Sequence, residues 1–185
     1  MRRSTPERDR AWLEELFDRH SHRLRAFAVR RVGPDAADDV VSEVFVTAWR
    51  RRRDVPDEPL AWLFQTARNR VMHHQRSSGR RASLRVAVQL SMQPAPAPSA
   101  EDQTRILVEA ILDELPATEA EILRLTVWEQ LTPSEVAVVL AITPGAARTR
   151  LMRARQRAQE LYEASLLATD ADTITDPAEH CSSRH

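Results

Sequence analysis

Apolar residues recur at helical spacing in three stretches of the N-terminal part of the chain. The stretches cover residues 12–27, 40–49 and 60–72, and each places its large side chains three or four positions apart. Gly33-Pro34-Asp35 separates the first stretch from the second, and Pro59 stands where proline favours the start of the third. The pattern predicts three amphipathic helices.

A second group of helical patterns follows in the C-terminal part. An apolar stripe over residues 106–112 ends at Leu115-Pro116. Thr118 with Glu121 and Thr132 with Glu135 have the spacing of capping boxes, which mark helix starts. Thr143 is placed to cap one further helix, with Pro144 at its first position. A short helix, a tight turn and a second helix outline a helix-turn-helix motif.

The segment between the two groups lacks helical character. Over residues 82–100 the only charge is Arg85, and three prolines alternate with Ala and Ser near the end of the segment. We therefore expect an all-α fold of two small helical domains joined by an extended linker. The predicted divisions are a first domain over residues 1–81, a linker over 82–100, a second domain over 101–165 and a disordered tail over 166–185.

Composition excludes several classes of protein. No stretch approaches the roughly 18 apolar residues of a membrane span, and the N-terminus runs into charge and not into an apolar signal core. The chain is therefore expected in the cytoplasm without membrane insertion. Three glycines leave no Gly-rich phosphate loop, and one cysteine, Cys181, forms neither an internal disulfide nor a zinc site by itself. We expect no enzymatic activity, no cofactor and no bound metal.

Charge is distributed unevenly along a chain whose net charge is zero. All 27 basic residues are arginine, and residues 1–81 hold 18 of them against 12 acidic residues. Residues 145–157, inside an otherwise acidic half, contain five arginines and no acid. A cationic stretch confined to one helix indicates a specific contact surface for nucleic acid, because guanidinium binds phosphate and guanine bidentately.

The arginine-bearing helix is the candidate DNA-recognition helix. Its N-terminal part is expected in the major groove, with Arg148 and Thr149 near the tip and Arg153 about one turn further along. An ordinary αα-hairpin with a solvated arginine face is the alternative. The predicted DNA-contacting residues are Arg148, Thr149, Arg150, Met152, Arg153 and Arg155.

Three segments together resemble a known family. Residues 39–49 resemble the polymerase-binding segment of extracytoplasmic-function (ECF) sigma factors, and residues 61–69 resemble the helix of that family that carries Ala-Arg-Asn. Residues 131–155 resemble its C-terminal helix-turn-helix. The resemblance covers residues 10–81 and 101–163, in the family's order. It implies that the chain binds core RNA polymerase, recognises duplex DNA at the −35 element and melted non-template DNA at the −10 element, and is restrained by an anti-sigma factor.

The resemblance also assigns roles to residues of the N-terminal part. The residues that match the polymerase-docking segment are Asp38, Asp39, Val41, Glu43, Val44 and Trp49. The valines and Trp49 have a place in the hydrophobic core as their alternative role, and the acids are the stronger interface candidates. The residues that match the −10-binding part are Asp54, Phe64, Arg68, Asn69, His73 and Arg76. Phe64 either stacks on a base or belongs to the core.

The residues alone leave two other hypotheses about function open. A conventional helix-turn-helix regulator needs no polymerase-docking helix, and a helical adaptor protein needs no arginines on a recognition helix.

One departure from the family is Ala141, which occupies the turn of the helix-turn-helix where glycine is common. Glycine tolerates left-handed backbone at lower cost.

Overall fold

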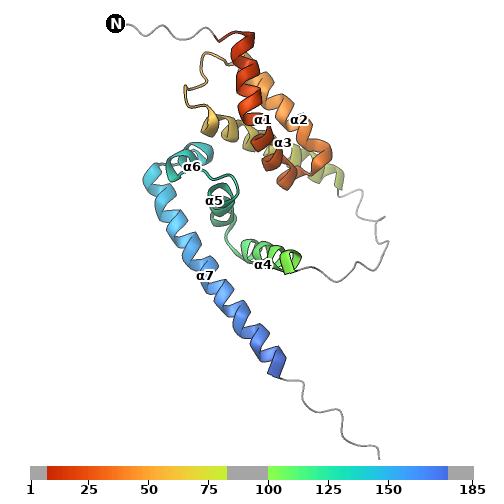
Figure 1. The fold of residues 1–185 in the computed structure, drawn as a ribbon, viewed down its shortest axis with the longest axis vertical. Helices are drawn as coiled ribbons and strands as arrows, with labels where there is room; N and C mark the ends of the chain where they lie inside the picture. Colours follow the sequence, from red (N-terminus) through yellow and green to blue (C-terminus); the bar gives the residue numbers. More distant parts are fainter. Residues whose placement is uncertain (1–7, 83–99, 175–185) are drawn as a thin grey trace, which may run out of the picture. The chain divides into compact units, whose positions relative to one another are not determined.

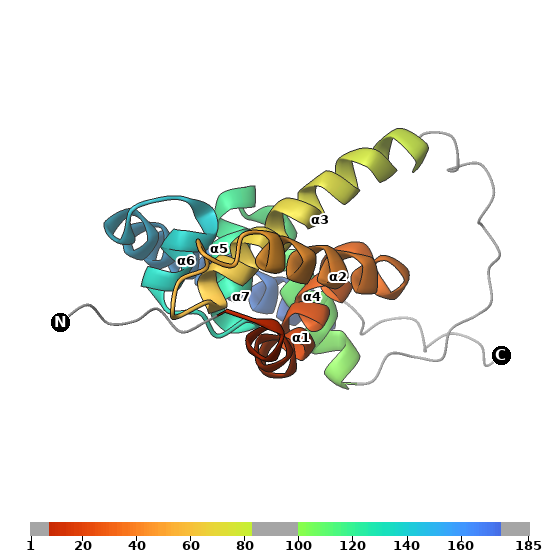
Figure 2. The ribbon, with the colours of Figure 1, turned by 90° about the horizontal axis from the view of Figure 1, so that it is seen from above.

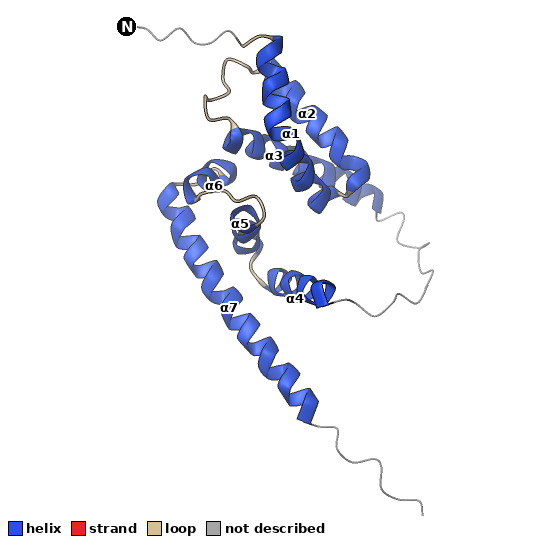
Figure 3. Cartoon of the chain, viewed as in Figure 1, coloured by secondary structure: helices blue, strands red, loops and turns tan. Residues whose placement is uncertain are grey.

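The computed structural model describes residues 8–82 and 100–174. Within these ranges the chain forms seven α-helices and no strand, which confirms the predicted all-α class (Figures 1 and 3). None of the described helices has the length and apolar character that a membrane crossing requires. The chain divides into two compact units, one formed by Met1–Pro94 with Leu125–Ala147 and the other by Ala95–Arg124 with Arg148–His185. The domain boundaries predicted from the sequence stay a prediction.

The first unit is built on a bundle of three helices. These are α1 (Arg10–Val32), α2 (Pro34–Arg50) and α3 (Leu60–Ala82), and each packs against the other two (Figures 1 and 2). Their apolar stripes meet in a core in which Leu24, Phe27, Val44, Leu63 and Phe64 are completely buried. The rings of Phe27 and Phe64 meet edge to face, with their centroids 5.3 Å apart.

Gly33 forms the predicted break between α1 and α2. Its φ of +79° lies in the region that favours glycine, and its N–H donates to the carbonyl oxygen of Val29 over 3.0 Å. Pro34 then begins α2, where a missing N–H is tolerated. This turn folds α2 back along α1.

The loop between α2 and α3 is fixed from the start of α1. Arg8, whose side chain is only 8% exposed, donates to the carbonyl oxygens of Arg52 and Val55 and pairs with Asp57 over 3.1 Å. Val55 is buried beneath the loop. The backbone of the loop is therefore held in one conformation beside α1.

The first unit also contains α6 (Pro133–Leu140), which packs against α3. The predicted capping box at its start is confirmed. The Thr132 N–H donates to Glu135 Oε2 over 2.8 Å, and the Glu135 N–H donates to Thr132 Oγ1 over 3.3 Å. Ala141 ends the helix in a left-handed conformation, at φ 52° and ψ 46°.

The predicted cap at Thr118 is wrong. Helix α4 (Ala100–Glu114) ends before Leu115-Pro116 as expected, but α5 (Ala117–Val127) already begins at Ala117. The Pro116 carbonyl oxygen accepts from the N–H groups of Glu119 and Ala120 over 2.7 and 3.0 Å, so Thr118 lies inside the first turn.

In the second unit, ion pairs join α5 to α4. Arg124 Nη2 of α5 lies 3.7 Å from Glu109 Oε2 and 3.6 Å from Asp113 Oδ1 of α4.

Helix α7 (Pro144–Ile174) is longer than the sequence pattern predicts. The expectation of disorder from residue 166 onward is wrong for residues 166–174. The physical reason is that no Gly or Pro interrupts the chain between Gly145 and Pro177, and Ala and Leu favour helix there. The remaining tail with Cys181, and the linker residues 83–99, lie outside the described residues.

Ala141→Gly is expected to stabilise the helix-turn-helix. Alanine at a positive φ carries a steric cost that glycine lacks, and we expect a gain of about 0.5–1 kcal/mol in the free energy of unfolding. Urea denaturation followed by circular dichroism measures it. Ala164→Gly, in the exposed interior of α7, should give the opposite sign. Equal destabilisation by both substitutions would contradict the assigned backbone conformation.

Candidate nucleic-acid and polymerase interfaces

The turn between α6 and α7 is closed by its own hydrogen bonds. The N–H of Ile142 donates to the Ala137 carbonyl oxygen over 2.9 Å, and that of Ala141 donates to the Val138 carbonyl oxygen over 3.2 Å. Thr143 caps α7 as predicted, because its Oγ1 accepts from the Ala146 N–H over 3.1 Å. These bonds hold the start of α7 at a defined angle to α6, as a helix-turn-helix requires.

Helix α7 has a buried side and an exposed side. Ala147, Leu151 and Ala154, at i, i+4 and i+7, are buried. Within the part of the chain that the structure describes, Arg148, Arg150, Arg153 and Arg155 form no ion pair, and the first turn of α7 contains no acid. The exposed residues include all six predicted DNA contacts: Arg148, Thr149, Arg150, Met152, Arg153 and Arg155.

Arg157 differs from these arginines. Its Nη1 lies 3.0 and 2.9 Å from the two carboxylate oxygens of Glu119. The guanidinium is thus engaged within the second unit. The arginines available to an outside phosphate or base lie closer to the start of α7.

Helix α3 presents a second polar face. Asn69, His73 and Arg76 are all exposed and lie at i, i+4 and i+7, as predicted. Arg68 is half-buried. Arg70 points toward α2, where it donates to Thr47 Oγ1 over 3.1 Å. The structure thus brings three of the predicted −10-binding residues onto one exposed side of one helix.

Two other predicted −10-binding residues lie elsewhere. Phe64 is completely buried against Phe27, so its ring has no exposed surface on which a base could stack. The hydrophobic core, the alternative role considered from the sequence, is where it lies. Asp54 is exposed in the loop, where its Oδ2 lies 3.2 Å from Arg51 Nε.

A cavity of about 260 Å³ opens beside this loop. Its walls come from α1, through Trp12 and His20, and from the loop, through Pro56 and Asp57. His20 Nδ1 is buried and has no hydrogen-bond partner among the described residues. Burial, together with the charges of the neighbouring Arg19 and Arg23, lowers the pKa of His20 below its ordinary value of 6.5.

The lowered pKa of His20 predicts a loss of stability in mild acid. Below about pH 6.5 the unfolded chain binds a proton that folded His20 binds only at lower pH, so stability falls as the pH decreases through this range. Thermal melts between pH 7.5 and 5.5 should show a smaller decrease in Tm for His20→Asn than for the unsubstituted chain. His22→Asn, on the exposed side of α1, should keep the original slope. A slope unchanged by His20→Asn would exclude this residue as the cause.

Helix α2 carries the predicted acidic residues on its exposed side. Asp38, Asp39 and Glu43 are all exposed. Asp38 Oδ1 lies 2.7 Å from Arg25 Nε, and Glu43 Oε2 lies 3.4 Å from Arg70 Nη1. Within the described residues Asp39 forms no ion pair, so it is the acid most available to a partner.

Two of the predicted docking residues are core residues. Val41 and Val44 are buried between the helices, because α2 turns its apolar stripe toward α1 and α3. Trp49 is exposed, with the Arg52 guanidinium 4.8 Å from its ring centroid. Val46, which the sequence analysis did not select, is 48% exposed on α2. Its position three residues after Glu43 places it on the polar side, and this spacing was available as a signal.

Comparison with known proteins decides the family. The family model described as "Sigma-70 region 2" matches residues 16–81, and the family model described as "Sigma-70, region 4" matches residues 105–157. RNA polymerase sigma factor CarQ of Myxococcus xanthus is 32% identical over 154 residues, which cover 80% of this chain and 87% of CarQ. The chain belongs to the ECF sigma factors of the sigma-70 family. Proteins of this family are non-catalytic regulators of transcription.

Other relatives agree with this family. ECF RNA polymerase sigma factor SigL of Mycobacterium tuberculosis is 28% identical over 150 residues, which cover 76% of the sigma factor described here and 83% of SigL. The probable RNA polymerase sigma factor RfaY of Xanthomonas campestris is 35% identical over 130 residues, but the present chain spans only 32% of its length.

A solved structure is similar to this sigma factor over most of its length. It is the sigma factor RpoE in complex with the anti-sigma factor NepR from Bartonella quintana, with a TM-score of 0.58 and 26% identity. The match covers 81% of this chain and 96% of RpoE.

Proposed function

We propose that this sigma factor binds core RNA polymerase and directs it to promoters by recognising a −35 and a −10 element. The observation that carries the proposal is a group of four exposed arginines on α7 that form no ion pair in the described part of the chain, namely Arg148, Arg150, Arg153 and Arg155. A second polar face on α3 and an acidic face on α2 accompany it. One chain thus offers two surfaces for DNA and one for a protein partner.

Helix α7 is the proposed −35-binding element. The N-terminal part of such a helix enters the major groove, and arginine there binds guanine through both O6 and N7. Arg148, Arg150 and Arg153 are exposed on this part of α7. The positive end of the helix dipole and the absence of acid in the first turn of α7 add attraction for a phosphate.

Helix α3 is the proposed −10-binding element. Melted DNA is gripped by arginines on its phosphates, and its unstacked bases are read by hydrogen bonds to their edges. Asn69 supplies donors and an acceptor for a base edge, and Arg76 lies about two turns further along α3 for the backbone. The cavity beside Asp57 is a candidate pocket for an unstacked base.

The exposed side of α2 is the proposed polymerase-docking surface. Asp39 and Glu43 supply charge, while Val46 and Trp49 supply exposed apolar area. An anti-sigma factor is a further proposed partner, since the similar RpoE structure is a complex with one. All these activities are proposed to take place in the cytoplasm, where the polymerase acts.

Run-off transcription with purified core polymerase on a library of promoter DNA tests the proposal. Transcripts that depend on the added chain should share two spaced motifs. Arg148→Ala should reduce selection at the upstream motif, and Asn69→Ala should reduce it at the downstream motif. Asp39→Ala should reduce binding to core polymerase without affecting duplex binding. A chain that retards specific duplexes but never binds core polymerase would instead be a conventional helix-turn-helix regulator.

A further inference from the structure

Glu129 is the one charged or polar residue that is buried within the described parts of the chain. Its side chain is 2% exposed, and it lies in the short connection between α5 and α6. A buried carboxylate is costly unless it is both paired and hydrogen-bonded. The partners of Glu129 therefore determine whether this connection is stable where it lies.

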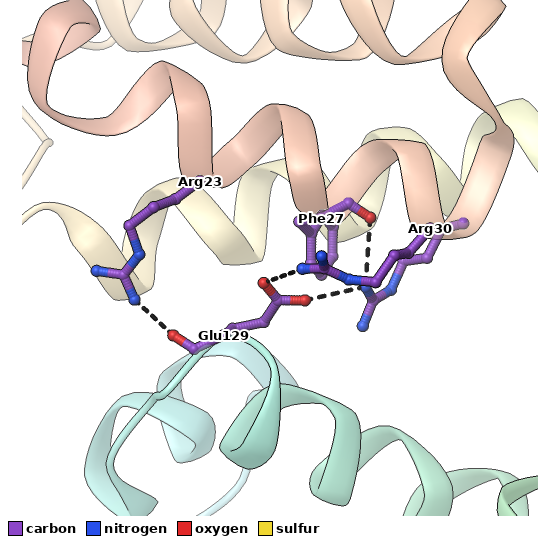
Figure 4. Close-up of polar contacts among 5 residues, drawn as sticks. Arg23, Phe27, Arg30 and Glu129 are labelled. Atoms are coloured by element: carbon purple, nitrogen blue, oxygen red, sulfur yellow. Dashed lines mark hydrogen bonds and ion pairs between the residues drawn. The ribbon is translucent and has the colours of Figure 1, made fainter. Parts of the chain in front are cut away.

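Three arginines of α1 supply these partners (Figure 4). Arg30 donates to Glu129 Oε2 over 2.6 Å, and Arg31 donates to Oε1 over 3.3 Å. Arg23 donates to the main-chain carbonyl oxygen of Glu129. Both carboxylate oxygens and the carbonyl oxygen are thus bound by guanidinium groups from one helix, about one hundred residues earlier in the chain.

The arginines are themselves held in position. The Arg31 guanidinium lies 3.7 Å from the ring centroid of Phe27 and donates to the Phe27 carbonyl oxygen over 3.3 Å. The Arg30 guanidinium lies 5.9 Å from the ring centroid of Trp128. Arginines fixed in this way lose less conformational freedom when they bind the carboxylate.

A second contact lies between the same parts of the first unit. Gln65 Nε2 of α3 donates to the Val138 carbonyl oxygen of α6 over 2.8 Å, and the two helices pack together. The first helix of the helix-turn-helix is therefore attached to the helix that carries Asn69 and His73. Helix α7 starts after a turn of only three residues, 141–143.

This attachment conflicts with the simultaneous binding of two promoter elements. Elements named for positions −35 and −10 are centred roughly 25 base pairs apart, or roughly 85 Å along the duplex at 3.4 Å per base pair. The 23 residues of α3 span only about 35 Å, and α6 packs directly against them. The start of α7 cannot reach a distant element while α6 stays on α3.

We propose that Arg23, Arg30, Arg31 and Glu129, here named the Glu129 latch, hold the free sigma factor in a closed conformation that must open before both elements are bound. The requirement to open rests on the proposed function, whereas the closed conformation itself does not. Only the open fraction of free chains binds productively, so the latch lowers the apparent affinity for polymerase and promoter by that fraction.

Distance measurements on the full-length chain test the closed conformation without polymerase or DNA. Spin labels are placed at the exposed Asp18 of α1 and Ser134 of α6, in a Cys181→Ser background. The unsubstituted latch should give one narrow distribution of label distances. Glu129→Gln keeps the shape of the side chain but removes its charge, and it should give a longer and broader distribution.

Matched variants distinguish opening of the latch from a general loss of folded structure. Arg30→Gln acts from the α1 side and should reproduce the effect of Glu129→Gln, and the double variant should open no further than Glu129→Gln alone. Glu119→Gln is the control, because Glu119 pairs with Arg157 within the second unit and its side chain is 12% exposed. This control should leave the label distances unchanged.

The second measurement is binding to core polymerase on a two-element promoter. Glu129→Gln should bind about tenfold more tightly than the unsubstituted chain, because the closed state no longer competes. Unchanged label distances in both Glu129→Gln and Arg30→Gln would overturn the latch. Longer distances with unchanged affinity would overturn the requirement to open. Absence of polymerase binding in every variant, with longer distances in the latch variants, would overturn the proposed function and leave the closed conformation standing.

Discussion

Phe64→Ala is expected to lower the free energy of unfolding of the α1–α3 bundle by about 3–5 kcal/mol. The ring is completely buried and meets Phe27 edge to face, so its removal leaves a cavity and ends an aromatic contact. A loss of this size approaches the whole stability of a small helical domain. Urea denaturation followed by circular dichroism measures it.

Phe17→Ala is the matched control, since this phenylalanine is 47% exposed on α1. It should cost clearly less than Phe64→Ala, because about half of the Phe17 side chain is already exposed, although its ring centroid lies 4.9 Å from that of Phe45. Phe64→Leu should recover most of the stability, and with it the binding of melted −10 DNA. A stable Phe64→Ala protein that had lost only DNA binding would restore the base-stacking role for this ring.

Arg148→Ala is expected to reduce affinity for the cognate −35 duplex about 10- to 100-fold, the range for loss of one bidentate contact to a base. Arg148 is exposed on the first turns of α7 and has no ion pair among the described residues. The loss should be larger for the cognate duplex than for a scrambled one. Fluorescence anisotropy with both duplexes, at several salt concentrations, separates base recognition from phosphate attraction.

Arg157→Ala supplies the comparison from the same helix. Its guanidinium is engaged with Glu119, so the substitution should weaken binding little and to the same extent for every duplex. If the two substitutions had equal effects on the cognate and scrambled duplexes, Arg148 would be a phosphate contact only.

The helices and their order were predictable because apolar spacing, prolines and capping residues are local signals. Each of these signals acts on backbone groups only a few residues away. The structure places three of them as predicted: Gly33-Pro34, Thr132 with Glu135, and Thr143. Thr118 is the exception, because Pro116 offers its carbonyl oxygen to the first turn before Thr118 is reached.

The side that each residue faces was less predictable. Val41, Val44 and Phe64 lie in segments that resemble binding surfaces, but whether an apolar residue of an amphipathic helix faces a partner or the core depends on where the neighbouring helices pack. No local pattern in the sequence indicated that Glu129 would be buried. Its arginine partners lie on α1, and only the folded chain brings them together.

Helix α2 has core residues on one side and exposed acids on the other, so substitutions on its two sides affect different properties of the protein. Val41 and Val44 maintain folding, whereas Asp39 and Glu43, on the same helix, face outward. Cellular abundance and transcriptional output therefore respond to different positions only a few residues apart. In a library of single substitutions across α2, low abundance should alternate with normal abundance at helical periodicity. Variants that remain abundant but inactive mark the partner surface, and compensating changes in the polymerase can arise there without altering the core of the bundle.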